Sequence, residues 1–111
     1  MAVLQPIIAQ FGPLPITTTA TIETDSPVIL SIAGSVWTSS ENCMIGIGLE
    51  VDGGAVAKAP IYSNGPGTHR TVVPLMIPVT FEIGEHTFAL GPLTPQTESD
   101  SNDYYAVSLQ Y

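Results

Sequence analysis

The side chains of this chain that could do chemistry gather in a polar segment close to its C-terminus. Glu98, Asp100, Asn102 and Asp103 supply carboxylate and amide oxygens there. Hard cations such as calcium bind several oxygen ligands at close range, so Glu98, Asp100 and Asp103 are candidate calcium ligands. Their spacing does not match an EF-hand loop. The favoured interpretation is a solvated loop whose Asp and Asn side chains cap turns, with no bound metal.

Histidine and arginine offer a second set of polar groups. His69 and Arg70 are adjacent, and His86 is the other histidine. Two histidines far apart in the sequence are weak evidence for a zinc site, which needs three or four ligands. In so acidic a chain Arg70 is expected to pair with a carboxylate such as Asp100 or Asp103. The alternative is that His69 and Arg70 donate hydrogen bonds to a bound glycan or peptide.

Aromatic side chains next to amides could bind a sugar. Trp37 and Tyr104 offer apolar faces, and Asn42 and Asn64 could bond sugar hydroxyls. The alternative is packing in the core or between subunits. The candidate ligand-binding residues are therefore Trp37, Asn42, Asn64, His69, Arg70, Asp100, Asn102, Asp103 and Tyr104.

Signals for catalysis are missing from the sequence. It has no G-x-S-x-G, no H-E-x-x-H and no glycine-rich phosphate loop. The single cysteine, Cys43, follows a polar loop and begins an apolar run, so it is expected to be a small buried residue. We therefore expect no catalytic residues, and a small enzyme is the weakest of the alternatives.

Composition limits the remaining classes of protein. The 111 residues fit a single domain, 1–111, with 44% hydrophobic and only 11% charged residues. Few charges suggest that other subunits cover part of the surface, which predicts a homo-oligomer. The net charge of −8, with Lys58 and Arg70 as the only Lys and Arg, excludes binding to DNA or RNA phosphates.

Prolines and glycines divide the chain into short segments of β type. The expected strands are 3–9, 16–24, 27–37, 43–51, 55–63, 69–77, 78–83, 86–90 and 104–111. Asp52-Gly53 predicts a tight hairpin between two of them. Turns this closely spaced indicate an all-β fold, an antiparallel two-sheet sandwich. A jelly roll is preferred, and an immunoglobulin-like sandwich is the alternative.

Two of these strands have an unusual face. In 27–37 the side that lacks the buried aliphatic residues is small and mixed, so it could meet a neighbouring subunit. In 43–51 Gly46 and Gly48 share one side, which leaves it bare for something bulky to pack over.

The segments that carry a resemblance to a known class of proteins are VILSIAGSVW, MIGIGLEVDGGAVA, GEHTFAL and YYAVSLQY. Through them the chain resembles the small trimeric jelly rolls of the tumour-necrosis-factor and C1q-like class. Similar shapes occur in bacterial and phage surface proteins and tail-fibre tips. The resemblance implies a homotrimer that recognises a glycan or protein receptor through loops or subunit grooves. The expected function is therefore a non-catalytic, self-associating module in adhesion or receptor recognition, and a carbohydrate-binding lectin domain is the alternative.

No segment reads as a signal peptide or is long enough to span a membrane as an apolar helix. The chain is therefore expected to be cytoplasmic, virion-associated, or exported by a route without a signal peptide.

Overall fold

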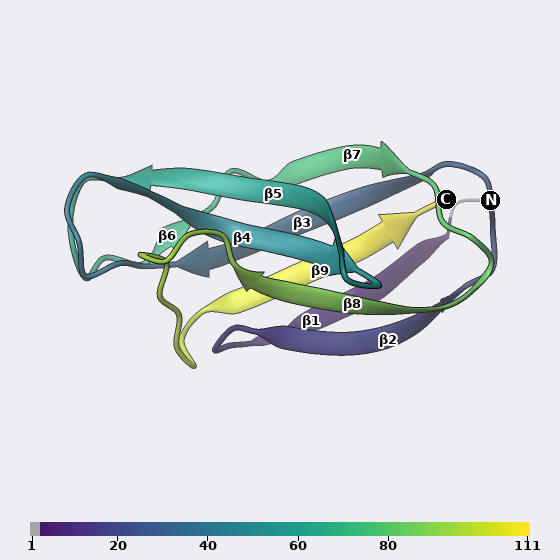
Figure 1. Ribbon diagram of the computed structural model, residues 1–111, viewed down its shortest axis with the longest axis horizontal. Helices are drawn as coiled ribbons and strands as arrows, with labels where there is room; N and C mark the ends of the chain where they lie inside the picture. Colours follow the sequence, from purple (N-terminus) through teal and green to yellow (C-terminus); the bar gives the residue numbers. More distant parts are fainter. Residues whose placement is uncertain (1–2) are drawn as a thin grey trace.

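Strands that alternate apolar and polar residues pack here into two facing sheets (Figure 1). The computed structural model describes residues 3–111. Its strands are β1 (Leu4–Phe11), β2 (Ile16–Ile22), β3 (Val28–Val36), β4 (Cys43–Val51), β5 (Gly54–Ser63), β6 (Arg70–Thr71), β7 (Leu75–Val79), β8 (Gly84–Pro92) and β9 (Tyr104–Gln110). None of the described residues belongs to a helix with the length and apolar character that a membrane crossing requires.

The order of the strands confirms the predicted jelly roll. One sheet runs β1-β9-β3-β6, with β7 also paired to β3, and the other runs β2-β8-β4-β5. The first strand therefore pairs with the last, β2 with β8, β3 with β7 and β4 with β5, all antiparallel. This nested pairing, split over two sheets, is the jelly-roll arrangement rather than the immunoglobulin-like alternative.

The core lies between the sheets and follows the predicted alternation. In β2 the end residues Ile16 and Ile22 are buried, while Thr17, Thr19 and Thr21 face solvent. The largest fully buried side chains are Tyr105, Phe88, Ile22, Leu30, Ile32, Ile45, Ile47, Leu49, Leu90 and Leu109. Burying this much apolar surface is the main stabilising contribution to the sandwich.

The predicted hairpin after β4 is confirmed. Asp52 and Gly53 have φ values of 53° and 85°, the left-handed pair that a tight turn between right-twisted strands requires. The Asp52 carboxylate also accepts a hydrogen bond from the Thr87 N–H at 2.9 Å, which ties the hairpin to β8.

The predicted bounds of the strands 69–77 and 78–83 are wrong. The first is split into β6 and β7 around Pro74, because proline lacks the N–H that pairing with β3 requires. Residues 80–83 form no strand, and β8 begins at Gly84, two residues before the predicted strand 86–90.

The two glycines of β4 have different roles, which a pair of substitutions can separate. A Cβ on Gly46 would lie 2.4 Å from the Ala59 carbonyl oxygen, whereas one on Gly48 would meet nothing closer than 3.7 Å. We expect Gly46→Ala to lower the free energy of unfolding by about 1–3 kcal/mol through overpacking. We expect Gly48→Ala to change it by less than about 1 kcal/mol, in the stabilising direction. Urea unfolding of both variants checks this, and equal effects would contradict the assignment.

Candidate functional sites

A histidine and two carboxylates meet where the β8–β9 loop packs against the ends of β3 and β6. His69 Nδ1 lies 2.7 Å from Asp103 Oδ1, and His69 Nε2 lies 3.6 Å from Asp100 Oδ2. The Asp103 side chain is completely buried, whereas those of His69 and Asp100 are 38% and 40% exposed. The predicted candidates His69, Asp100 and Asp103 are thus brought together, although 31 and 34 positions separate the histidine from the two aspartates.

The buried carboxylate of Asp103 is surrounded by donors. The Ser35 hydroxyl donates to Oδ1 at 2.7 Å, and the Asp100 N–H donates to Oδ2 at 2.9 Å. With His69 on Oδ1 as well, both oxygens are bonded, as a buried carboxylate requires. We call Ser35, His69, Asp100 and Asp103 the loop latch, because they fasten the β8–β9 loop to β3 and to the segment before β6.

The same geometry bears on metal binding. One ligand atom from each of His69, Asp100 and Asp103 lies within 4.8 Å of the other two, so these three residues could surround a cation. A cation bound by Asp103 would have to displace the His69 and Ser35 donors from its carboxylate. The geometry therefore favours the hydrogen-bonded latch over a metal site. Glu98, predicted to join Asp100 and Asp103, lies elsewhere: its carboxylate accepts the Ser39 N–H at 3.0 Å. The strand-like pairing of its backbone with Trp37 fixes that position.

The loop latch lacks the arrangement of a nucleophile and its base. The Ser35 hydroxyl bonds the Asp103 carboxylate, and it is the same carboxylate that His69 contacts. In hydrolytic triads the serine instead bonds the histidine, which removes its proton. This cluster can therefore hold a loop and offer polar atoms to a ligand, but it does not activate its serine.

Arg70 does not pair with Asp100 or Asp103, so that prediction is wrong. Its guanidinium donates to the Ser63 hydroxyl at 3.3 Å and to Asn64 Oδ1 at 3.2 Å, both at the end of β5. The reason lies in the register: Arg70 pairs with Val36 at the sheet edge, next to the strand end that carries Ser63 and Asn64.

The remaining predicted residues are dispersed. The Trp37 ring lies 5.9 Å from that of His69. The backbone N–H of Asn102 donates to the Asp100 carboxylate at 2.8 Å, so the Asp100 side chain caps this turn. Asn42, at φ 52°, is an exposed turn residue before β4. Tyr104 lies on the outer face of the sheet and packs edge to face against Phe11, with ring centroids 4.9 Å apart.

Tyr104 belongs to a surface of which the sequence predicts only one strip. Strands β1, β3, β7 and β9 contain no charged residue. Four of the exposed large apolar side chains point outward from this sheet: Leu4, Phe11, Met76 and Tyr104, at 69%, 60%, 65% and 44% exposure. Between them lie small residues in register, Ala9, Ala33 and Ala106. We call this surface the uncharged face. The small side of 27–37 indicated one strip of it, and the strand order adds the rest.

Comparison with known proteins supports the fold. No protein-family model matches the chain, and no curated protein matches it significantly. Among solved structures, dimeric latent PorU from Porphyromonas gingivalis matches with a TM-score of 0.59 and 8% identity, over 98% of this chain and 12% of that one. The sugar-binding EclA C-terminal domain matches with a TM-score of 0.50 and 14% identity, over 100% of this chain and 77% of that one. The chain thus spans only a small part of PorU.

A third structure, from the Gx strain of infectious bursal disease virus, matches with a TM-score of 0.48 and 16% identity, over 99% of this chain and 32% of that one. At identities this low, the two matches with TM-scores of 0.50 or more show a shared all-β fold alone and nothing about ligands. A specific relation to the tumour-necrosis-factor and C1q-like class stays a prediction.

Both histidines make stability depend on pH. The hydrogen bond to Asp103 raises the pKa of His69, and the bonds to the Glu82 carbonyl and the Asp52 carboxylate raise the pKa of His86. Because each histidine has a higher pKa in the folded state, its protonation stabilises the fold. This contribution to the free energy of unfolding is complete below the unfolded pKa of about 6.5, and it is lost as the pH rises through the folded pKa. We expect the melting temperature to fall as pH rises from 6 to 9, and the double variant H69N/H86N to show a smaller fall. A pH profile shared by both proteins would contradict this.

The loop latch predicts an asymmetry between its two carboxylates. Asp103→Asn replaces one buried oxygen with an NH₂ group that meets a donor, so we expect a loss of about 2 kcal/mol in the free energy of unfolding. Asp100→Asn keeps the oxygen that caps Asn102 on a half-exposed side chain, so it serves as the matched control, with an expected change below about 0.5 kcal/mol. Chemical denaturation measures both, and the reverse order would exclude the latch.

Proposed function

We propose that this chain is a non-catalytic binding and assembly module that self-associates through the uncharged face. The observation that carries the proposal is the absence of charge from β1, β3, β7 and β9, combined with outward Leu4, Phe11, Met76 and Tyr104. A monomer rarely exposes a contiguous apolar patch above a few hundred Å². Four strands about 4.8 Å apart and seven residues long span about 19 by 23 Å. The uncharged face, in which Ser31 and Ser108 lie among the apolar side chains, therefore covers an area of that order.

The distribution of charge favours a second copy of the chain as the partner. Two molecules of net charge −8 repel each other, and most other surfaces of the chain carry carboxylates. Carboxylates lie in the loops, on β4 and on β8, such as Glu23, Glu41, Glu50, Glu85 and Glu98. Contact through the uncharged face buries none of these, so it avoids the cost of desolvating like charges.

The number of copies remains the prediction drawn from the resemblance, which is three. A trimer joined by this face leaves the loops and the other sheet open to a receptor, and adhesion or receptor recognition is the role we propose for them. The jelly-roll fold is compatible with this role but does not select it.

Carbohydrate binding is the second candidate function. The observation that favours it is the half-buried Trp37 ring beside His69, with the half-exposed Asp100 and the exposed Asn102 next to them. An aromatic surface bordered by acceptors suits a sugar. The fold shared with the sugar-binding EclA domain is consistent with it, at 14% identity.

Mass in solution tests the assembly proposal. We expect light scattering after size exclusion to give a multiple of 11.7 kDa, with three copies expected. Ala106→Glu places a carboxylate between Ala9 and Ala33 in the middle of the uncharged face, and we expect it to yield single chains. Thr19→Glu adds the same charge to an outward position of the other sheet and is expected to leave the mass unchanged.

Two outcomes oppose the proposal. A single chain at high protein concentration would remove self-association, and the loop site around Trp37 would become the better candidate. An oligomer that survives Ala106→Glu but dissociates with Thr19→Glu would place the interface on the other sheet.

A further inference from the structure

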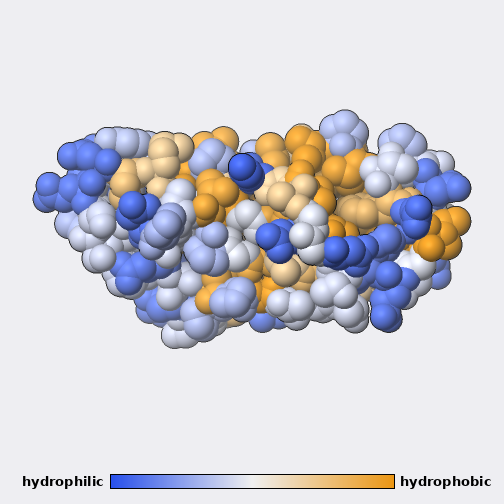
Figure 2. All heavy atoms as spheres, viewed as in Figure 1, coloured by the Kyte–Doolittle hydropathy of each residue, from blue (hydrophilic) through white to orange (hydrophobic). Residues whose placement is uncertain are grey.

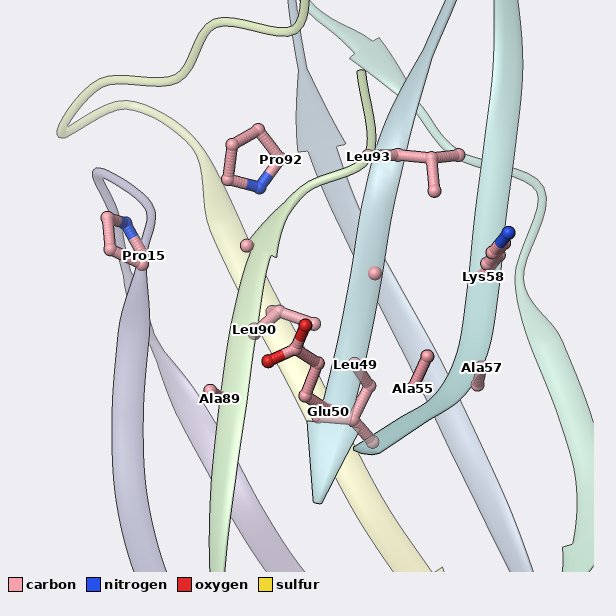
Figure 3. A pocket seen from close by; sticks show the side chains of 12 residues that line it. Pro15, Leu49, Glu50, Ala55, Ala57, Lys58, Ala89, Leu90, Pro92 and Leu93 are labelled. Atoms are coloured by element: carbon pink, nitrogen blue, oxygen red, sulfur yellow. The ribbon is translucent and has the colours of Figure 1, made fainter. Parts of the chain in front are cut away.

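The sheet opposite the uncharged face carries a hollow. Figure 2 shows this side of the molecule, with apolar residues across its middle and hydrophilic residues at its left end. The hollow has a volume of about 300 Å³, at the small end of the range for ligand sites. It lies over β8, β4 and β5, as Figure 3 shows. Its lining includes Pro15, Leu93, Glu50 and Lys58.

The floor of the hollow is made by two glycines whose presence the fold does not explain. Gly48 and Gly91 are direct partners across β4 and β8. Neither has a positive φ, so neither is required by the backbone. A Cβ on Gly91 would meet nothing within 4 Å, and one on Gly48 would meet only ordinary contacts. Gly46 is different, because close approach of the β5 backbone explains it.

Glycine inside a strand costs about 0.5–1 kcal/mol relative to alanine, and it marks places where another group approaches the backbone closely. Together with Ala89, the two glycines leave a floor almost bare of side chains, with Pro15, Leu93 and Glu50 among the other lining residues. The bare side of β4 predicts that something bulky packs over it. The Leu93 side chain covers part of this side, since its Cδ1 would lie 3.7 Å from a Cβ on Gly48. The rest of the space stays open.

Opposite polar groups border this floor. Lys58, the only lysine of the chain, is the β5 partner of Gly48, and Glu50 follows two positions later on β4. Within the described residues Lys58 makes no ion pair with any carboxylate, although the chain has ten Asp and Glu residues. In Figure 3 Glu50 reaches between β4 and β8, while Lys58 lies on β5. The hollow thus offers one donor group and one acceptor group around an apolar floor.

We propose that this hollow binds one neutral pyranose ring. The flat C–H face of the sugar rests on Gly48 and Gly91, the Lys58 ammonium donates to a ring hydroxyl, and another hydroxyl donates to Glu50. The net charge of −8 disfavours an anionic ligand, and a lone lysine next to a glutamate disfavours a strongly cationic one. A single ring also matches the small volume of the hollow.

This inference deepens the second candidate function, carbohydrate binding, and moves its site from the Trp37 loop to the sheet. It does not depend on self-association, because the hollow and the uncharged face belong to different sheets. An assembled protein can therefore fill its hollows, and the two proposals fail separately.

Titration of ¹⁵N-labelled full chain with methyl glycosides of glucose, galactose and mannose, each to about 100 mM, tests the proposal. We expect at least one of them to shift the amide signals of Gly48 and Gly91, whereas those of Trp37 and His69 stay unchanged. Gly91→Val fills the open floor and is expected to weaken binding at least tenfold. Thr19→Val introduces the same residue at an outward position of the same sheet, outside the hollow, and is expected to leave binding intact. Glucuronate is expected to bind more weakly than the neutral glycosides.

Three results would overturn the inference. The first is that no neutral glycoside shifts the hollow signals of the folded protein. The second is a response at Trp37 and His69 instead, which keeps carbohydrate binding but removes the hollow as its site. The third is binding that Gly91→Val leaves unchanged while its spectrum shows an intact fold, or tighter binding of glucuronate than of the neutral sugars.

Discussion

The structure depends on the position of β9 between β1 and β3. This strand forms antiparallel ladders on both of its edges, and its inward side chains Tyr105, Val107 and Leu109 are completely buried. It brings the two ends of the chain together, since Val3 and Tyr111 exchange backbone hydrogen bonds. A central strand of this kind can form only after distant segments have met, so the sandwich is built from long-range contacts. Burial in this layer raises the pKa of the Tyr105 hydroxyl.

The loop latch secures the start of the same strand. Asp103 immediately precedes β9, and its N–H and carbonyl also bond Asp100 and Gly12. A buried carboxylate is costly unless its oxygens are bonded, so His69 and Ser35 must stay in place for the β8–β9 loop to keep its course. The chemistry-bearing residues near the C-terminus are thus largely used to hold the fold. That use explains why a cluster with metal-binding composition is better understood as a structural element.

Charge is distributed unevenly over the two sheets. The β1-β9-β3-β7 layer presents an uncharged outer surface, whereas the β2-β8-β4-β5 layer carries Glu50, Asp52 and Lys58. An acidic protein that keeps one face free of charge can associate through that face without bringing carboxylates together. The other sheet, which stays exposed in such an assembly, holds the glycine-floored hollow. In the function that we propose, the uncharged face therefore serves assembly and the other sheet serves recognition.

The sequence by itself determined the class of fold, because period-two alternation, β-branched residues and turn signals act locally. It also determined the boundaries of β4 and the Asp52-Gly53 hairpin, and it drew attention to His69, Asp100 and Asp103. Only the tertiary structure decided which polar residues meet. Pairing between β3 and β6 places Arg70 where it bonds Asn64 rather than a carboxylate. Backbone pairing between Trp37 and Glu98 holds Glu98 away from Asp100 and Asp103. The uncharged face and the hollow also required strand order, because each joins residues from strands far apart in the chain, and no local pattern records which strands become neighbours.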